Sequence, residues 1–480
     1  MFRFQRIVLA GWLCLCGGMG YAEETPEKVP VEDTFEAYRV LIDTIDQVDR
    51  NYVGQLSKRE LIDAAIEGVL KKLDPYSDYI SPERMESFRK NVDSKFGGIG
   101  VMLNVDGDKI VVVSPLVNTP AYRAGVFSGD VILEVDGESV VGFSADEVSQ
   151  RMKGEIGTTL TLKLLREGNP KPFTLTVERD MISMETVSGF DRLEDDSWNY
   201  WMDAPHGIAY VAISSFGQDT ATQLREVLEN LQKPTEEGGE PALKALILDL
   251  RFNPGGILPV AIDVCDLFLE DGVIVSIQGR NTEERVWKAK KDDSLLEKIP
   301  MTVLINHYSA SASEIVAACL QDHGRAVVIG ERSWGKGSVQ NVMELEDGNS
   351  ALKLTTAGYH RPNGKNIHRA EDATESDEWG VVPQEEFYVA MTPEQQGRLA
   401  EDQRRRHELR THQVNENPAW SQRGFEDPQL QKAMEVLEGE LKTNVNVQAL
   451  LRKRLNPTIS YQDTPVSPAR TPATRGWRRR

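Results

Sequence analysis

The sequence predicts a multidomain α/β protein, with a β-rich domain ahead of a larger α/β core and helical segments at both ends. A chain of 480 residues has room for about two to four domains of roughly 100–200 residues each. Residues 207–390 alternate apolar strands with helices, which is typical of layers around a largely parallel sheet. Residues 96–179 show short alternating strands separated by Asp-Gly and Glu-Gly turns, which favour a β-rich domain.

The composition excludes several classes of protein. Hydrophobic residues make up 40% of the chain, which is too many for a largely disordered protein. A formal net charge of −20 repels phosphates and argues against nucleic acid as the main partner. There are 7 His and 4 Cys, without a CxxC pair or an HExxH motif, so we expect no metal and no cofactor.

Residues 1–22 are predicted to be a secretory signal peptide. Arg3 and Arg6 lie in a short n-region, residues 7–19 are mostly apolar, and Gly20-Tyr21-Ala22 is a small-x-small cleavage signal. The apolar stretch is shorter than the ~20 residues of a membrane span, and an uncleaved N-terminal anchor is the alternative. We therefore expect an exported protein in the periplasm or another extracytoplasmic space, with association with the membrane left open.

Helical periodicity predicts a helical N-terminal segment over residues 31–92, in which Pro75 breaks the second helix. Within the β-rich domain, Ser144 and Glu147 form a capping box at the start of a short helix that carries Val148. The core is predicted over 200–390, with strands at 208–213, 243–250, 301–305 and 326–329 and helices at 220–231, 257–269 and 313–322.

The C-terminal part of the chain is predicted to be a charged helical extension over 391–456 and a disordered basic tail over 457–480. The Arg-rich end of this tail is either a solvated segment or a segment that binds a membrane surface or nucleic acid. Cys265 and Cys319 lie in apolar runs, so we expect two buried core residues, with a disulfide as the alternative.

Residues 330–337 contain Lys336 and at first resemble a phosphate-binding P-loop. That motif needs Ser or Thr directly after the Lys and then a helix. Here Gly337 takes the hydroxyl position and residues 338–345 have the pattern of a strand. ATP binding is therefore not expected, and the Lys needs another explanation.

Ser309-Ala-Ser-Ala-Ser-Glu-Ile315 lies between a predicted strand and a predicted helix. A hydroxyl at such a turn projects from the sheet edge, where free N–H groups can bind an oxyanion; a helix N-cap is the alternative explanation. Gly255-Gly256, which end the run from Asp249, could aim another N–H into the same site or merely form a tight turn.

These loops together supply a hydroxyl, a Lys and oxyanion donors. A Lys whose pKa is lowered by burial can remove the proton of a Ser, so a Ser-Lys dyad is a coherent hypothesis. His307, or His323 with Asp322, offers a Ser-His-Asp alternative, but His323 lies at the far end of the helix from Ser311.

Five ordered motifs resemble those of the carboxyl-terminal processing peptidases, the tail-specific proteases of family S41, over roughly residues 35–390. They are Leu73-Asp-Pro-Tyr-Ser77, Phe96-Gly-Gly-Ile-Gly100, Leu248-Asp-Leu-Arg-Phe-Asn-Pro-Gly-Gly256, the Ser309–Ile315 run and Gly335-Lys-Gly-Ser-Val-Gln340. The resemblance implies that Ser311 is the nucleophile, Lys336 the general base and Gln340 the residue that orients the Lys amine. It also implies oxyanion donors at the amide of Ala312 and at Gly255 or Gly256, which it does not distinguish.

Residues 96–180 resemble a PDZ domain. The resemblance implies that backbone N–H groups around Gly98 to Gly100 hold a free C-terminal carboxylate while the peptide adds a strand beside Ile99 and Val101. Val148 on the capped helix is a candidate to line a pocket for the last side chain of the peptide.

The resulting hypothesis is an exported serine endopeptidase that recognises protein or peptide C-termini and cleaves through an acyl-enzyme. The alternative is a non-catalytic PDZ adaptor on a protease-like scaffold. The oligomeric state stays open.

Overall fold

The computed structural model describes residues 31–85, 88, 97–182, 185–193, 195–234, 243–296, 299–407, 426–443 and 447. The chain divides into two compact units, residues 1–75 and 76–480. The predicted signal peptide and basic tail lie outside the described residues. No helix in the described ranges combines the length and the apolar character that a membrane crossing requires.

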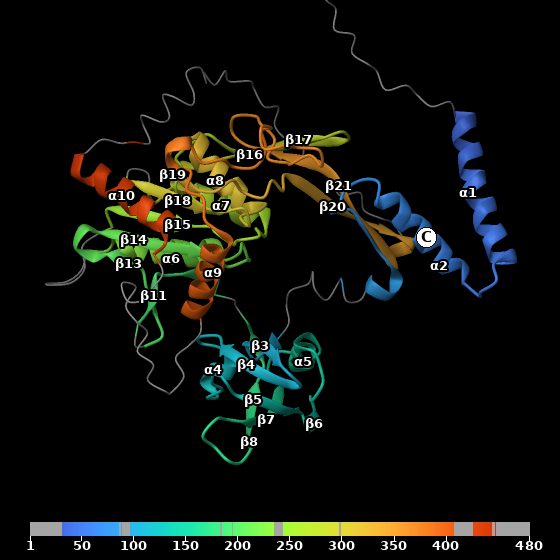
Figure 1. Ribbon diagram of the computed structural model, residues 1–480, viewed down its shortest axis with the longest axis horizontal. Coiled ribbons are helices and arrows are strands. Elements are labelled where there is room, and N and C mark those ends of the chain that lie inside the picture. The colour runs from blue at the N-terminus through green and yellow to red at the C-terminus, as the bar shows by residue number, and fades with distance from the viewer. Residues whose placement is uncertain are drawn as a thin grey trace, which may run out of the picture. The chain divides into compact units, whose positions relative to one another are not determined.

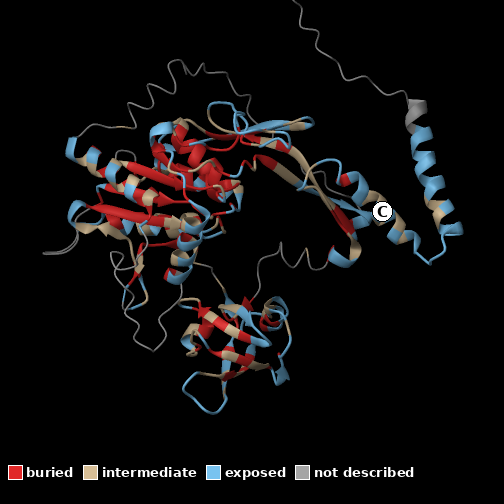
Figure 2. Ribbon diagram, in the orientation of Figure 1, coloured by how far each residue is buried: buried red, intermediate tan, exposed pale blue. Residues whose placement is uncertain are grey.

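The first unit contains two helices, α1 (Val31–Asn51) and α2 (Lys58–Leu70). Ser57 caps α2, because its hydroxyl accepts from the N–H of Glu60 and its own N–H donates to the Glu60 carboxylate. From Phe35 onward, most residues of α1 are exposed (Figure 2).

The expectation of a helical segment over 31–92 is wrong for residues Asp78–Ile80. They form strand β1, which pairs antiparallel with β21 (Ser350–His360) and buries Tyr79 and Ile80. The partner strand lies far along the chain, so the local pattern around Pro75 carries no trace of this pairing.

The β-rich domain is an antiparallel sheet of order β3-β4-β5-β7-β8 with β6 beside β5. Its elements are β3 (Val101–Asp106), β4 (Lys109–Pro115), α4 (Pro120–Arg123), β5 (Val131–Val135), β6 (Glu138–Ser139), α5 (Ala145–Met152), β7 (Thr159–Leu165) and β8 (Phe173–Glu178). The predicted capping box at α5 is present, and β2 (Gly97–Gly98) pairs with β9 (Asp180–Met181).

The core sheet has the order β10-β14-β15-β18-β19, with β13 also beside β14 (Figure 1). Its strands are β10 (Val187–Ser188), β13 (Trp201–Asp203), β14 (Ile208–Ile213), β15 (Ala245–Asp249), β18 (Met301–Ile305) and β19 (Val327–Gly330). The four strands from β14 to β19 run parallel, as the alternation of strands and helices predicts.

Helices cover both faces of this sheet, and the central strands are buried (Figure 2). Alternate strand side chains pack on one face against α6 (Thr220–Gln232), α7 (Leu258–Asp266) and α8 (Ala312–Asp322). The other face packs against α10 (Pro428–Thr443) of the C-terminal extension. Helix α9 (Pro393–His407) precedes α10, and Cys265 and Cys319 are buried free thiols on α7 and α8.

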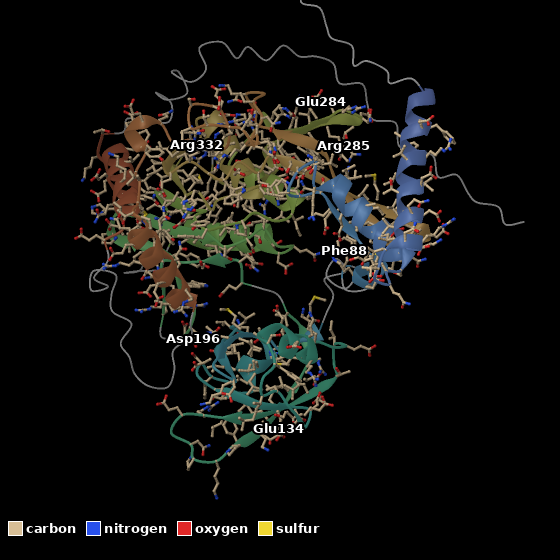
Figure 3. The ribbon with its side chains drawn as sticks, turned by 45° about the vertical axis from the view of Figure 1, so that its right-hand side comes forward. Phe88, Glu134, Asp196, Glu284, Arg285 and Arg332 are labelled. Atoms are coloured by element: carbon tan, nitrogen blue, oxygen red, sulfur yellow. The ribbon has the colours of Figure 1, made fainter. Side chains whose placement is uncertain are left out.

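A second, antiparallel sheet has the order β1-β21-β16-β17, with β20 (Ser338–Leu345) paired with β21. It includes β16 (Val273–Gly279) and β17 (Thr282–Lys288), on which Glu284 and Arg285 lie exposed at the outer edge (Figure 3). The short elements are β11 (Asp191–Arg192), β12 (Trp198–Asn199) and the 3-10 helices η1 (Ala204–His206), η2 (Lys291–Asp293), η3 (Glu346–Gly348) and η4 (Glu385–Phe387).

Candidate active site

Three loops follow the carboxyl ends of parallel strands β15, β18 and β19. They contain the glycine pair, the serine run and Lys336, respectively. The carboxyl ends of parallel strands share one edge of the sheet, which is where open α/β sheets place their sites. The fold therefore brings together the three loops that the sequence singles out.

The three serines of the run occupy different environments. Ser309 is fully buried; its hydroxyl donates to the carbonyl of Leu250 and accepts from the N–H of Asn306. Ser313 is also fully buried and donates to the carbonyl of Asn253. Ser311 is only partly buried and adopts a φ of 56°, which is unusual for a residue other than glycine. The hydroxyls of Ser309 and Ser313 thus bind the neighbouring loop after β15, whereas no hydrogen bond between described residues joins the Ser311 hydroxyl to another loop.

Glu314 ties the serine loop to the lysine loop. Its side chain is fully buried, and one oxygen, Oε2, accepts from the N–H of Ser311 at 2.7 Å and from the N–H of Lys336 at 2.8 Å. The other oxygen, Oε1, accepts from the N–H of Gly335 and the hydroxyl of Ser333, each at 2.6 Å. Burial raises the pKa of Glu314 to about 7, although these four hydrogen bonds favour the ionised form.

Lys336 is half-buried, and its surroundings favour the neutral amine. Burial lowers the pKa of Lys336, and the positive charge of Lys353 on β21 adds to this effect, while Glu314 opposes it. The Nζ atom lies over the ring of Tyr76, 5.1 Å from the ring centroid. Trp334, on the same loop as Lys336, donates a long hydrogen bond of 3.4 Å to the Tyr76 hydroxyl.

The glycine pair lies directly beside the serine. A Cβ added to Gly255, whose φ is 102°, would come within 2.7 Å of Cβ of Ser311 and 2.9 Å of N of Ala312. The N–H of Gly255 already donates to Oδ1 of buried Asn253 at 2.8 Å. Gly256 is exposed, and no hydrogen bond found among the described residues uses its N–H.

Gln340 lies on β20, four residues after Lys336. Its amide nitrogen donates to the hydroxyls of Ser338 at 2.9 Å and Thr355 at 3.2 Å. No hydrogen bond between described residues joins Gln340 to Nζ of Lys336, or Nζ to the Ser311 hydroxyl. The orienting role of Gln340 therefore stays a prediction.

No hydrogen bond between described residues joins a histidine of the alternative triad to Ser311. The ring of His323 bonds to the carbonyl of Val273 at 2.7 Å, and Asp322 is held by Arg361 and Asn363. The ring of His307 lies against that of Tyr308, with centroids 3.8 Å apart. His323 and Asp322 are thus engaged with groups other than Ser311, and no hydrogen bond between described residues joins His307 to Ser311.

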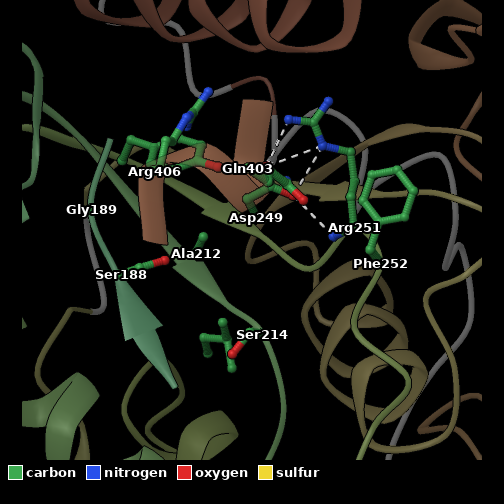
Figure 4. A pocket seen from close by; sticks show the side chains of 11 residues that line it. Ser188, Gly189, Ala212, Ser214, Asp249, Arg251, Phe252, Gln403 and Arg406 are labelled. Carbon is green, nitrogen blue, oxygen red and sulfur yellow. Dashed lines mark hydrogen bonds and ion pairs between the residues drawn. The ribbon is translucent and has the colours of Figure 1, made fainter. Parts of the chain in front are cut away.

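The glycine loop begins at a buried cluster of charges. Arg251 binds the Asp249 carboxylate and also Asp427 and Gln429 at the start of α10. A cavity of about 80 Å³ adjoins this cluster, and Figure 4 shows Arg251 with the ring of Phe252 beside it. The C-terminal extension, which sequence patterns left without a role, thus contacts the loop that carries Gly255.

In the β-rich domain, the predicted peptide-binding residues lie at the start of the end strand β3 and on α5. The carbonyls of Ile99 and Gly100 accept from the N–H groups of Ala121 and Leu116, while no described hydrogen bond uses the N–H of either residue. Val101 begins β3, the end strand of the sheet, next to α5. Val148 is fully buried in the same apolar cluster as Ile99.

Glu314 and Tyr76 are residues whose place in the site the sequence analysis did not assign. The spacing of Ser311 and Glu314 is that of a capping box, and this signal could have identified Glu314. Tyr76 belongs to the Leu73–Ser77 motif, but the resemblance gave this residue no role. The described residues contain no group of three or more His, Cys, Asp or Glu side chains suited to a metal ion.

Comparisons with known proteins agree with this architecture. The profile of peptidase family S41 matches residues 207–384, and that of the PDZ domain matches residues 97–177. The chain is 39% identical over 338 residues to the carboxy-terminal-processing protease of Bartonella bacilliformis, which covers 70% of this chain and 74% of that protein.

Carboxy-terminal processing protease CtpB of Bacillus subtilis is 30% identical over 384 residues, which is 76% of each protein. Among solved structures, the photosystem II D1 C-terminal processing protease aligns over 76% of this chain and 94% of that chain, at 27% identity and a TM-score of 0.40.

Proposed function

Because the chain belongs to peptidase family S41 and carries a PDZ domain, we propose that it is a serine endopeptidase that cleaves polypeptides selected by their C-termini. Ser311 is the nucleophile and Lys336 the general base. The observation that carries this proposal is the Glu314 carboxylate, which binds the backbone N–H groups of both residues and so fixes their loops against each other.

The chemistry follows from the two side chains. The neutral amine of Lys336 removes the proton of the Ser311 hydroxyl as its oxygen attacks the carbonyl carbon of the scissile peptide bond. The lysine, now an ammonium, gives that proton to the leaving amide nitrogen, and an ester joins Ser311 to the N-terminal part of the substrate. Lys336 then deprotonates a water molecule that hydrolyses the ester and restores the serine.

Two backbone N–H groups are suited to bind the oxyanion. The Ala312 N–H lies at the start of α8, where the helix dipole favours negative charge. The second donor in this proposal is Gly256, because the N–H of Gly255 is already bound to Asn253. Gly255 instead has no side chain, which lets the backbone of its loop lie close to Ser311. Gln340 orients the amine of Lys336 through its carboxamide oxygen.

The PDZ domain selects the substrate in this proposal. The N–H groups of Ile99 and Gly100 bind the terminal carboxylate, with Gly98 completing the loop, and the peptide pairs with the open edge of β3 from Val101 onward. Because Val148 is fully buried, a pocket for the last side chain there requires α5 to move away from β3. Export by the predicted signal peptide would place both domains with extracytoplasmic substrates.

Ser311→Ala tests the function. This variant should lose cleavage of an unstructured substrate with an apolar tail while it keeps binding of the tail, measured by fluorescence anisotropy. Turnover at the wild-type rate would exclude the proposed nucleophile.

A non-catalytic PDZ adaptor is the competing function, and a serine-reactive fluorophosphonate probe separates the two. The peptidase should be labelled at Ser311, and Lys336→Ala should abolish the labelling. An adaptor would bind tails, and the wild-type protein would not be labelled under any condition.

A further inference from the structure

Two aromatic rings stand beside the catalytic loops. Phe252 lies three residues before Gly255, and Tyr308 lies three residues before Ser311. Their rings stack, with centroids 5.4 Å apart and planes inclined by 22°. The Tyr308 side chain is 45% exposed, and Phe252 is only partly buried. The ring pair therefore joins the loop after β15, which carries Gly255, to the loop after β18, which carries Ser311, and leaves part of the Tyr308 ring exposed.

One buried side chain fixes both aromatic residues. Asn306, which is 1% exposed, accepts through Oδ1 from the N–H of Phe252 at 3.0 Å and from the N–H of Tyr308 at 3.2 Å. The N–H of Asn306 itself donates to the buried hydroxyl of Ser309. The aromatic pair is thus anchored to the same loop that positions Ser311.

The backbone of Phe252 points to a function for its ring. Its φ is 60°, in the left-handed region that bulky residues rarely adopt. Strained positions of this kind persist where the surroundings enforce them, and they cluster at functional sites. The ring does not fill the core, because it faces Tyr308 on one side and lines the 80 Å³ cavity (Figure 4).

We propose that Phe252 and Tyr308 form a substrate subsite that binds an aromatic or large aliphatic side chain within two residues of the scissile bond. This inference rests on the proposed peptidase function and adds to it a preference for the residue near the cut. Stacked rings offer a rigid apolar face that attracts a further ring by offset or edge-to-face contact. The two aromatic residues belong to the loops that carry Gly255 and Ser311, each three residues away along the chain, so a polypeptide held at Ser311 would have this face near its reacting carbonyl.

Matched peptides test the subsite. Internally quenched peptides would share one apolar C-terminal tail and differ at single positions around the cut, where each carries Phe, Leu, Ala or Glu; mass spectrometry would locate the cleavage. The wild-type protein should favour Phe or Leu over Ala at one of these positions by about tenfold in kcat/KM, the usual discrimination of an apolar pocket.

The variants localise that preference. Tyr308→Ala should bring the Phe/Ala ratio close to one, Phe252→Leu should reduce it, and Tyr308→Phe should retain it because the ring remains. Tyr52→Ala is the control. It removes an exposed tyrosine directly after α1 and should leave the Phe/Ala ratio unchanged.

Two outcomes would overturn the inference. Cleavage by Tyr308→Ala with the wild-type ratio would exclude the subsite and leave the peptidase function standing. Absence of any cleavage or probe labelling in the wild-type protein would overturn both proposals together.

Discussion

Arg251 and Asp427 form a buried ion pair, with Nη2 of the arginine 2.8 Å from Oδ2 of the aspartate. The two residues are 176 positions apart in the sequence. Arg251 opens the glycine loop, while Asp427 also caps α10, because its Oδ1 accepts from the N–H groups of Gln429 and Leu430. One carboxylate therefore both starts the C-terminal helix and neutralises the arginine behind the active-site loop.

Asp427→Ala should lower the free energy of unfolding by about 3–5 kcal/mol, because it leaves a buried guanidinium short of a partner. Chemical denaturation of the purified protein measures this loss. Glu438→Ala is the control, since its pair with Lys442 is exposed and should contribute no more than about 1 kcal/mol. Equal losses in the two variants would show that Asp427 does not stabilise the loop in this way.

Gly255→Ala should reduce kcat by about 10² or more, because the new methyl group would displace Ser311 from its position. Gly364→Ala is a matched control: its φ of 82° is also positive, but nothing lies within 4 Å of the added Cβ. Steady-state kinetics on both variants separates the steric effect from the strain of a positive φ. A similar loss in both would assign the effect to backbone strain alone.

Glu314→Gln should reduce kcat by about 10–100-fold with little change in KM, since the PDZ groove is untouched. An amide has one acceptor oxygen, so it keeps only one of two pairs of hydrogen bonds: either that from Ser311 and Lys336 or that from Ser333 and Gly335. Ser333→Ala, which removes a single donor, should have a smaller effect. Wild-type kcat in a folded Glu314→Gln protein would contradict the role of this carboxylate.

The pH dependence of kcat/KM should show the titration of Lys336. In the proposed mechanism the neutral amine is the active form, so activity should rise with pH, and the lowered pKa places this rise below the ordinary lysine value of about 10.4. Lys353→Met removes a neighbouring positive charge, so it should raise the pKa of Lys336 and move the rise to higher pH. Lys288→Met, on exposed β17, should not move it; a shift to lower pH in Lys353→Met would contradict the assignment.

Much of the core could be predicted because its signals are local. Continuous apolar runs predicted β14 and β18 with the bounds that the structure has, and the strand-like pattern of residues 338–345 did the same for β20. The three loops follow from these strands, since parallel strands place their carboxyl ends together. Resemblance to a family then assigned roles within them.

The remaining parts depend on contacts between distant segments. Asp427 and Arg251 gave no joint signal, since an aspartate before a helix is fully explained by capping. The strand at 78–80 is short, and among the described strands it pairs with β21 alone. The left-handed φ of Phe252 and Ser311 is imposed by surrounding loops, because neither residue type favours it.

The ring of Tyr76 lies under Nζ of Lys336 because strand β1, which follows Tyr76, pairs with β21. The hydroxyl of the neighbouring Ser77 accepts from the N–H of Thr355 on β21, a residue 278 positions further along the chain. A chain trimmed to begin at residue 97 would keep the proposed nucleophile Ser311, the proposed oxyanion donors and Glu314. Lys336 would lose its contact with the Tyr76 ring and become more hydrated. Its pKa would rise, so the amine would stay protonated at neutral pH. In the proposed peptidase, loss of β1 would thus lower activity, whereas zymogen activation raises activity by removing an N-terminal segment.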